Sequence, residues 1–198
     1  DPSPNVQLAS DSDQMLIAVV GETVLGLDRY ERAVRWSRAV GSDVRSVTLT
    51  CDPPMFVRFG STLEAWSPHN GEVLWSRDID GLTDELPLRG GVLADWEDAW
   101  LVGNPVLRFD PSNGGVTDTA TSATPGPGVA MVYGQELIIA IDGGLRALDR
   151  DDLTATWFVS TSSPVVQLVG SQSRILALTE EGELLRITGD GELEDSWW

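Results

Sequence analysis

The sequence predicts an all-β protein: a β-propeller of about five four-stranded antiparallel blades, with almost no helix. Two observations predict this fold. Similar hairpin-forming segments recur about every 40 residues along the 198-residue chain, and two short apolar runs precede each of them. In addition, no 11-residue window keeps the 3.6-residue hydrophobic period of a helix.

The hairpin segments carry the clearest signal. Each has a short apolar strand, a polar residue, a turn of Pro, Gly, Asn or Asp, and an alternating second strand. They cover residues 26–36, 65–75, 108–118, 147–157 and 186–197. Their last residues are separated by 39, 43, 39 and 40 positions, which is the period of a propeller blade.

The apolar runs supply the other two strands of each blade. In chain order they are 5–9 and 15–20, 44–50 and 55–59, 91–95 and 99–102, 128–133 and 136–141, and 165–169 and 174–178. We therefore predict a single domain over residues 1–198, with blades at about 5–40, 44–79, 91–121, 128–160 and 165–198. The uncharged stretch 119–135 contains Gly126-Pro127-Gly128 and is expected to be a loop that leads into a strand.

Composition excludes several functions. The net charge is −18, from 31 acidic and 13 basic residues, and every basic residue is Arg. A strongly acidic surface repels phosphate and anionic lipid, which argues against nucleic-acid binding and membrane docking. One Cys and one His supply neither an internal disulfide nor a Cys/His zinc site. Most acids fall at hairpin ends, where they form the polar rim that keeps a strand-rich protein soluble.

The hairpins resemble a known repeat. Their sequences are similar to Ala-x-Asp-x-x-Thr-Gly-x-x-x-Trp, the hallmark of the pyrroloquinoline-quinone-like (PQQ-like) propeller family. The characteristic residue patterns of kelch and WD40 repeats are absent. The resemblance implies that Trp on the outer strand docks against the next blade and that Asp closes the turn. The implied docking residues are Trp36, Trp75, Trp157 and Trp197, and the implied turn-closing residues are Asp28, Asp110 and Asp149.

Three departures from the repeat stand out. Ser67 replaces Asp in the second unit, and Asp118 replaces Trp in the third. The Thr-Gly pair is missing from the first and fourth units.

The family implied by the resemblance contains both enzymes and scaffolds. Its quinoprotein dehydrogenases hold PQQ and Ca²⁺ in an eight-blade ring, which needs roughly 320 residues, and use a vicinal disulfide. This chain has room for five blades, and Cys51 has no adjacent partner. We therefore expect no cofactor, no metal and no enzymatic activity.

The residue inventory agrees with a non-catalytic protein. His69 lies in a hairpin turn and is expected to be a solvated turn residue, and Cys51 is expected to be a small buried hydrophobe. Residues 76–81 mimic the start of an EF-hand, but loop position 12 falls on Pro87, which has no carboxylate.

The lengthened repeat between the second and third units is the candidate partner-binding segment. Acidic residues gather around two Trp residues there, a combination suited to a basic protein partner. The residues proposed are Trp96, Trp100, Asp84, Glu85, Glu97 and Asp98. Under the alternative interpretation Trp100 is core, one Trp compensates for Asp118, and the acids are a solvated rim.

Three functions are compatible with these features. The first is an extracytoplasmic interaction scaffold, an accessory or assembly component of a membrane or envelope complex, whose protein partner is basic or membrane-embedded. The second is the ligand-sensing extracellular domain of a membrane receptor such as a kinase, and the third is a quinoprotein-type enzyme. The chain lacks an initiator Met, so we expect either that a signal or anchor has been removed or that the chain is part of a longer protein. A cytoplasmic location stays open.

Closure of the ring allows two arrangements. The first and fifth blades either meet directly, with Trp197 and Trp198 at the seam, or belong to a larger propeller.

Overall fold

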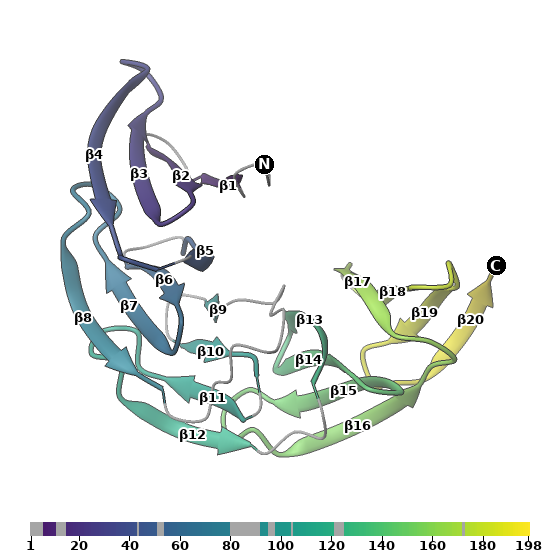
Figure 1. The fold of residues 1–198 in the computed structure, drawn as a ribbon. Helices are drawn as coiled ribbons and strands as arrows, with labels where there is room; N and C mark the ends of the chain where they lie inside the picture. Colours follow the sequence, from purple (N-terminus) through teal and green to yellow (C-terminus); the bar gives the residue numbers. More distant parts are fainter. Residues whose placement is uncertain are drawn as a thin grey trace. The chain divides into compact units, whose positions relative to one another are not determined.

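The computed structural model describes residues 6–10, 15–42, 44–50, 54–79, 92–94, 98–103, 105–120, 125–171 and 173–198. Twenty β-strands form five separate four-stranded sheets, and no helix is found in the described part (Figure 1). Within each sheet the strands follow one another in chain order, as they do in a propeller blade. The predicted all-β architecture is thus confirmed at the level of each sheet.

The strand bounds follow the apolar runs and hairpins of the sequence. The first sheet contains β1 (Val6–Ser10), β2 (Met15–Val20), β3 (Thr23–Asp28) and β4 (Ala33–Ala39), and the second contains β5 (Val44–Thr48), β6 (Met55–Phe59), β7 (Thr62–Trp66) and β8 (Val73–Asp78). The third contains β9 (Val92–Ala94), β10 (Ala99–Leu101), β11 (Val106–Phe109) and β12 (Val116–Ala120). The fourth contains β13 (Pro125–Tyr133), β14 (Glu136–Ile141), β15 (Gly144–Asp149) and β16 (Ala155–Ser160). The fifth contains β17 (Val165–Gly170), β18 (Arg174–Thr179), β19 (Leu184–Thr188) and β20 (Leu193–Trp197).

One segment differs from the sequence prediction. Gly126-Pro127-Gly128 lies within β13, which begins at Pro125, and is not a loop before the strand. The irregularity of pairing between Pro125 and Ala130 accommodates this segment, because a bulge tolerates residues that cannot continue a regular ladder.

The outer hairpin keeps one register in four sheets. Residue pairs Gly26–Trp36, Ala65–Trp75 and Ala147–Trp157 lie opposite each other in the first, second and fourth sheets, and each is followed by a bulge. In the fifth sheet, Arg186 lies opposite Asp195 at the same place relative to the bulge. This register defines which residue of each blade takes the docking position.

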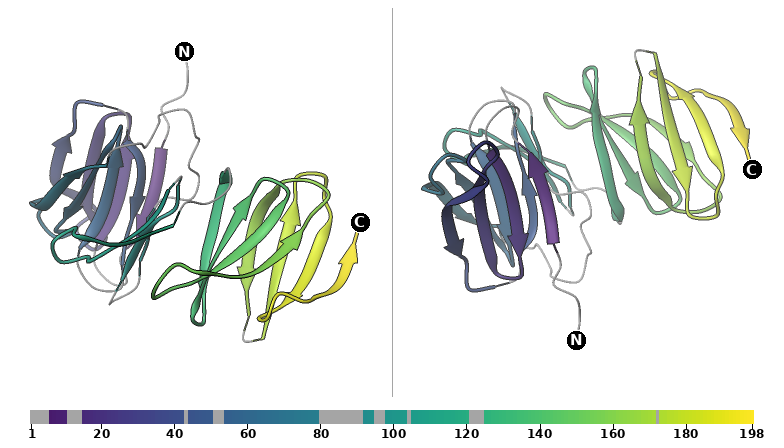
Figure 2. Two further views of the ribbon diagram at one scale, coloured as in Figure 1. Left: turned by 90° about the horizontal axis from the view of Figure 1, so that it is seen from below. Right: turned by 90° about the horizontal axis from the view of Figure 1, so that it is seen from above.

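The chain divides into two compact units. One comprises residues 1–84, 94–100 and 109–117, and the other comprises 85–93, 101–108 and 118–198. In the first unit, a buried core that includes Ile17, Met55 and Trp66 joins the first and second sheets. In the second unit, Leu145, Ile175 and other residues join the fourth and fifth sheets, which lie side by side in both views of Figure 2.

Candidate functional site

The turns between the third and fourth strands are held by short polar side chains. A carboxylate oxygen of Asp28 accepts hydrogen bonds from the backbone N–H groups of Tyr30 and Glu31, both at 2.8 Å. Asp110 and Asp149 accept the corresponding bonds from Ser112 and Asp151 at 2.8 Å. Such bonds to an aspartate stabilise a tight turn locally.

At Asp28 and Asp110 these contacts also favour the ionised carboxylate. The pKa of Asp28 is lowered first by the backbone N–H of Glu31, against the opposing effect of desolvation, and Arg35 at 2.8 Å contributes further. The pKa of Asp110 is lowered chiefly by the hydroxyl and backbone N–H of Ser112. Asp28 and Asp110 are therefore committed to local structure and carry stabilised negative charge.

Three tryptophans join one sheet to the next through the same two contacts. The indole Nε1 of Trp36 donates a hydrogen bond to the Pro68 carbonyl at 2.9 Å, Trp75 to Pro111 at 2.7 Å, and Trp157 to Gly189 at 3.1 Å. Each ring also lies against a glycine of the same turn: Gly71, Gly114 and Gly191, respectively.

The glycines beneath these rings have no spare room. A Cβ added to Gly71, Gly114 or Gly191 would lie 2.7, 2.8 or 2.5 Å from the nearest ring atom. All three also have positive φ, of 69°, 69° and 82°, which favours glycine independently of the ring. We call these contacts the Trp–Gly junctions.

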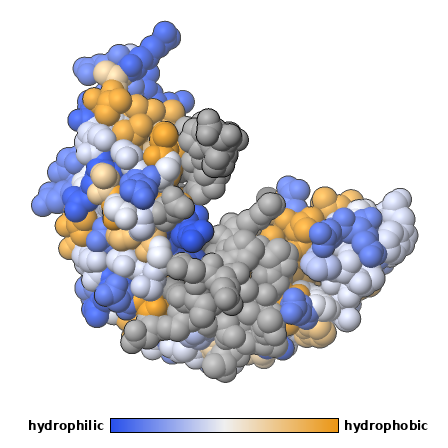
Figure 3. Space-filling model, in the orientation of Figure 1, coloured by the Kyte–Doolittle hydropathy of each residue, from blue (hydrophilic) through white to orange (hydrophobic). Residues whose placement is uncertain are grey.

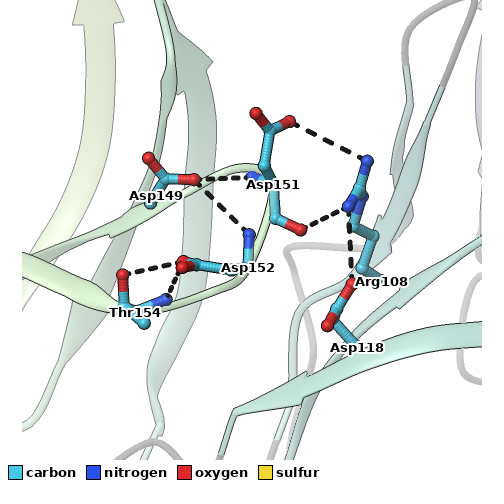
Figure 4. Close-up of polar contacts among 6 residues, drawn as sticks. All are labelled: Arg108, Asp118, Asp149, Asp151, Asp152 and Thr154. Atoms are coloured by element: carbon cyan, nitrogen blue, oxygen red, sulfur yellow. Dashed lines mark hydrogen bonds and ion pairs between the residues drawn. The ribbon is translucent and has the colours of Figure 1, made fainter.

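The third sheet meets the fourth differently, because Asp118 stands where the other sheets have Trp. Arg108, on β11, contacts the Asp118 carboxylate at 3.4 Å (Figure 4). Its guanidinium also donates to the backbone carbonyl of Asp151, in the turn of the fourth sheet, and lies 3.9 Å from the Asp151 carboxylate. Arg108 thus occupies the small-residue position of Gly26, Ala65 and Ala147 and makes the inter-sheet contact that Trp makes elsewhere.

Polar contacts also order the receiving turn. Asp152 accepts hydrogen bonds from the hydroxyl and the backbone N–H of Thr154, at 2.7 and 2.9 Å, and these bonds lower its pKa (Figure 4). Leu153 follows with φ of 57°, at the position that is glycine in the Trp–Gly junctions, and its side chain is buried. We call this contact the Arg–acid junction.

The fifth sheet places Trp197 differently from the sequence expectation. Its turn is one residue shorter, so Asp195 takes the docking position opposite Arg186, and Trp197 pairs with Leu184. Arg186 contacts Glu194 at 3.0 Å, and its guanidinium lies 5.4 Å from the centre of the Trp197 ring.

The predicted partner-binding residues are only partly within the described structure. Trp100 is fully buried on β10, so it is a core residue and cannot contact a partner, in agreement with the alternative interpretation. Asp98 is half-buried, while Trp96, Asp84, Glu85 and Glu97 lie outside the described residues.

The remaining candidates add no reactive constellation to the described part. His69 is exposed in its turn, and Cys51 lies outside the described residues. Among the side chains described, no group of three or more His, Cys, Asp or Glu residues is placed to hold a metal ion. Nor does the described part contain a helix of the length and apolarity needed to cross a membrane.

Comparisons with known proteins define the class of protein first. The chain is a β-propeller protein, since its fold matches solved propellers over nearly all of its length. BamB from Moraxella catarrhalis is 16% identical with a TM-score of 0.77, covering 97% of this chain and 63% of that one. The computationally designed Ika8 protein is 12% identical with a TM-score of 0.80, covering 97% and 61%. Hsv2 from Kluyveromyces lactis is 14% identical with a TM-score of 0.69, covering 98% and 62%.

The family follows from the sequence. A family model described as outer membrane protein assembly factor BamB matches residues 60–193, so the chain belongs to that family. This confirms the resemblance to the PQQ-like repeat. The chain spans less than two thirds of the length of these solved structures, and no curated protein matches it.

Proposed function

We propose that the chain is a non-catalytic interaction scaffold that works outside the cytoplasm, as an accessory or assembly component of a cell-envelope complex. The observation that carries the proposal is the family match over residues 60–193. The family is named for an outer membrane protein assembly factor, and a role of that kind needs binding surfaces and no reaction chemistry.

The use of polar residues in the described structure supports this role. The aspartates that might have served chemistry close turns, and the cation that replaces a docking Trp holds two sheets together. A scaffold requires a rigid framework that displays loops, and such a framework is what repeated blade junctions provide.

For the partner surface we propose the segment around Trp96, with Asp84, Glu85, Glu97 and Asp98. An indole flanked by carboxylates offers both a face for a cation and ionic partners for Lys or Arg, so the matching partner is basic. Trp100 is no longer part of this surface because it is buried.

The test is affinity capture from membranes of the producing cell, followed by identification of the captured proteins. The tagged protein is compared with a D84N/E85Q/W96A variant and with an E180Q/E181Q/W198A control, which likewise removes two carboxylates and one indole, from exposed positions beside the strands of the fifth sheet. We expect an envelope assembly complex to be recovered with the parent and the control, and to be lost with the variant.

Other outcomes would replace the proposal. Repeated recovery of no envelope protein would contradict the scaffold role. A thermal-shift screen in which one small molecule selectively raises the melting temperature would favour a ligand-sensing domain. Equal capture by the variant would leave the scaffold role standing but remove the Trp96 segment as its surface.

A further inference from the structure

The chemistry of each turn matches the side chain that docks on it. The three turns with glycine at the left-handed position receive an indole ring, from Trp36, Trp75 or Trp157. The turn of the fourth sheet has Leu153 in place of that glycine and two exposed aspartates, and it receives Arg108. A glycine turn therefore receives Trp, and an acidic turn receives a cation.

The turn of the first sheet, residues 28–32, follows neither pattern. Arg32 has φ of 52° and occupies the position of Gly71, Gly114, Leu153 and Gly191. Since a mere Cβ at the three glycines would lie within 2.8 Å of a docked ring, the Arg32 side chain leaves no room for Trp. This turn is therefore suited to a binding partner other than an indole ring.

Three of the four exposed side chains of this turn are cationic or aromatic. Arg29 and Arg32 are exposed, and within the described part no ion pair or hydrogen bond joins their side chains to another residue. Tyr30, between them, is 76% exposed. Asp28 is buried and already paired with Arg35 at 2.8 Å, so Glu31 is the one exposed acid in the turn.

These arginines belong to a cluster of positive charge in a chain whose net charge is negative. Five of the 13 arginines lie within residues 29–45, although the net charge is −18. The end of the β3–β4 hairpin, uppermost in Figure 1, is correspondingly hydrophilic in the space-filling view (Figure 3). Arg32 also keeps a left-handed backbone that glycine would adopt without strain, and retained strain of this kind is typical of functional positions.

We propose that the turn of residues 28–32 binds an acidic segment of a partner protein. Carboxylates of that segment accept hydrogen bonds from the guanidinium groups of Arg29 and Arg32, and Tyr30 packs against its backbone and side-chain stems. The inference goes beyond the scaffold role and rests on other residues than the Trp96 segment, so it stands if that role fails.

An acidic segment fits better than an anionic membrane. Charges in physiological salt interact over about 8 Å, so a flexible segment at this turn is screened from the acidic remainder of the protein. A flat anionic bilayer extends far beyond that distance and would face the remaining surface, which repels it.

The experiment measures the fluorescence anisotropy of a labelled peptide of about ten glutamates, titrated with the 198-residue protein at about 50 and 300 mM salt. An R29Q/R32Q variant is compared with R174Q/R186Q, which removes two arginines from the fifth sheet. We expect the parent to bind, more weakly at high salt, and R29Q/R32Q to weaken binding at least about tenfold. The control should remain within about twofold of the parent, because its charge loss is the same but lies elsewhere.

A third variant separates binding from folding. R32G removes the cation while relieving the left-handed strain, so its melting temperature should not fall even though peptide binding weakens. No binding by the parent at low salt would overturn the proposal, as would equal weakening in both double variants. Binding to vesicles of anionic lipid but not to the peptide would also overturn it, in favour of a membrane surface.

Discussion

The Trp–Gly junction between the second and third sheets offers a quantitative test of how the blades are joined. G114A has two separable costs. The positive φ of 69° opposes any side chain by about 1–2 kcal/mol. A Cβ 2.8 Å from the Trp75 ring must also displace that ring, and overpacking of this kind costs about 1–3 kcal/mol.

A double-mutant cycle with W75A isolates the second cost. Removing the indole eliminates the clash, so G114A in the W75A background should cost only the backbone strain of about 1–2 kcal/mol. The coupling between the two sites is then about 1–3 kcal/mol, which is well above the additivity error for independent sites. W75A alone should cost about 3 kcal/mol, because it removes a half-buried ring and its 2.7 Å bond to Pro111.

Gly21 provides the matched control in the same unit. It has φ of 60°, but nothing lies within 4 Å of the position of an added Cβ. G21A should therefore cost the strain alone. All variants are compared by urea unfolding at one fixed sucrose concentration, which raises the stability of every protein and keeps the double variant folded. A G114A cost no larger than that of G21A, or additive effects of G114A and W75A, would refute the junction as described.

Three other predictions follow from the described contacts. R108A should lower the free energy of unfolding by about 1.5–3 kcal/mol, because it removes charge-assisted contacts to Asp118 and Asp151. R108A/D118W/L153G should regain part of that loss by rebuilding a Trp–Gly junction. A triple variant less stable than R108A would contradict the idea that the two kinds of junction are equivalent. The lowered pKa values of Asp28, Asp110 and Asp152 contribute stability that is present above their unfolded pKa, near 3.9, and is lost as pH falls through the folded values. The free energy of unfolding, followed by circular dichroism, should therefore fall more steeply below about pH 4. D110N should make this dependence on pH flatter. Calcium at a few millimolar should leave the melting temperature unchanged, because Pro87 cannot complete an EF-hand; a clear rise reversed by a chelator would show a site that the sequence pattern does not predict.

The sequence predicts the strands well because each blade repeats one local pattern. Apolar runs such as Met15–Val20, Met55–Phe59 and Glu136–Ile141 are strands with the same ends in the structure. Their bounds are set by local turn residues and by alternation, both of which are visible in the letters.

The residue at each blade junction was harder to predict, because it depends on register. Trp197 lies 11 residues after Arg186, whereas each docking Trp lies 10 residues after its aligned small residue, so Trp197 would take the docking position only if the fifth turn were one residue longer. The turn hydrogen bonds show otherwise: the N–H of Thr188 donates to the carbonyl of Glu192, four residues on, whereas Asp149 reaches Thr154, five residues on. One residue fewer moves Asp195 into the docking position, and Trp197 then lies two residues further along β20, opposite Leu184.

Arg108 and Arg32 were missed for a related reason. The sequence shows Asp118 in place of Trp and Leu153 in place of Gly, but as separate departures from a repeat. Only the geometry shows that a small residue faces Trp across the hairpin and a glycine lies beneath its ring, so that Arg108, Asp118 and Leu153 are one coordinated replacement. The signal was nevertheless in the letters: Arg108 aligns with Gly26, Ala65 and Ala147 in the third unit, where Asp118 stands for Trp, and the fifth unit has the same pair in Arg186 and Asp195.

The same reasoning indicates a binding role for the turn of the first sheet. In the four junctions within this chain, the residues of each turn match the side chain that docks on it. An arginine in the glycine position therefore identifies a turn on which the Trp of another blade cannot dock. Three of the four junctions described in the repeat of this chain join blades through tryptophan. The positions where this chain departs from that repeat are therefore where its individual interactions should be sought, and the turn of residues 28–32, with its exposed Arg29, Tyr30 and Arg32, is the clearest of them.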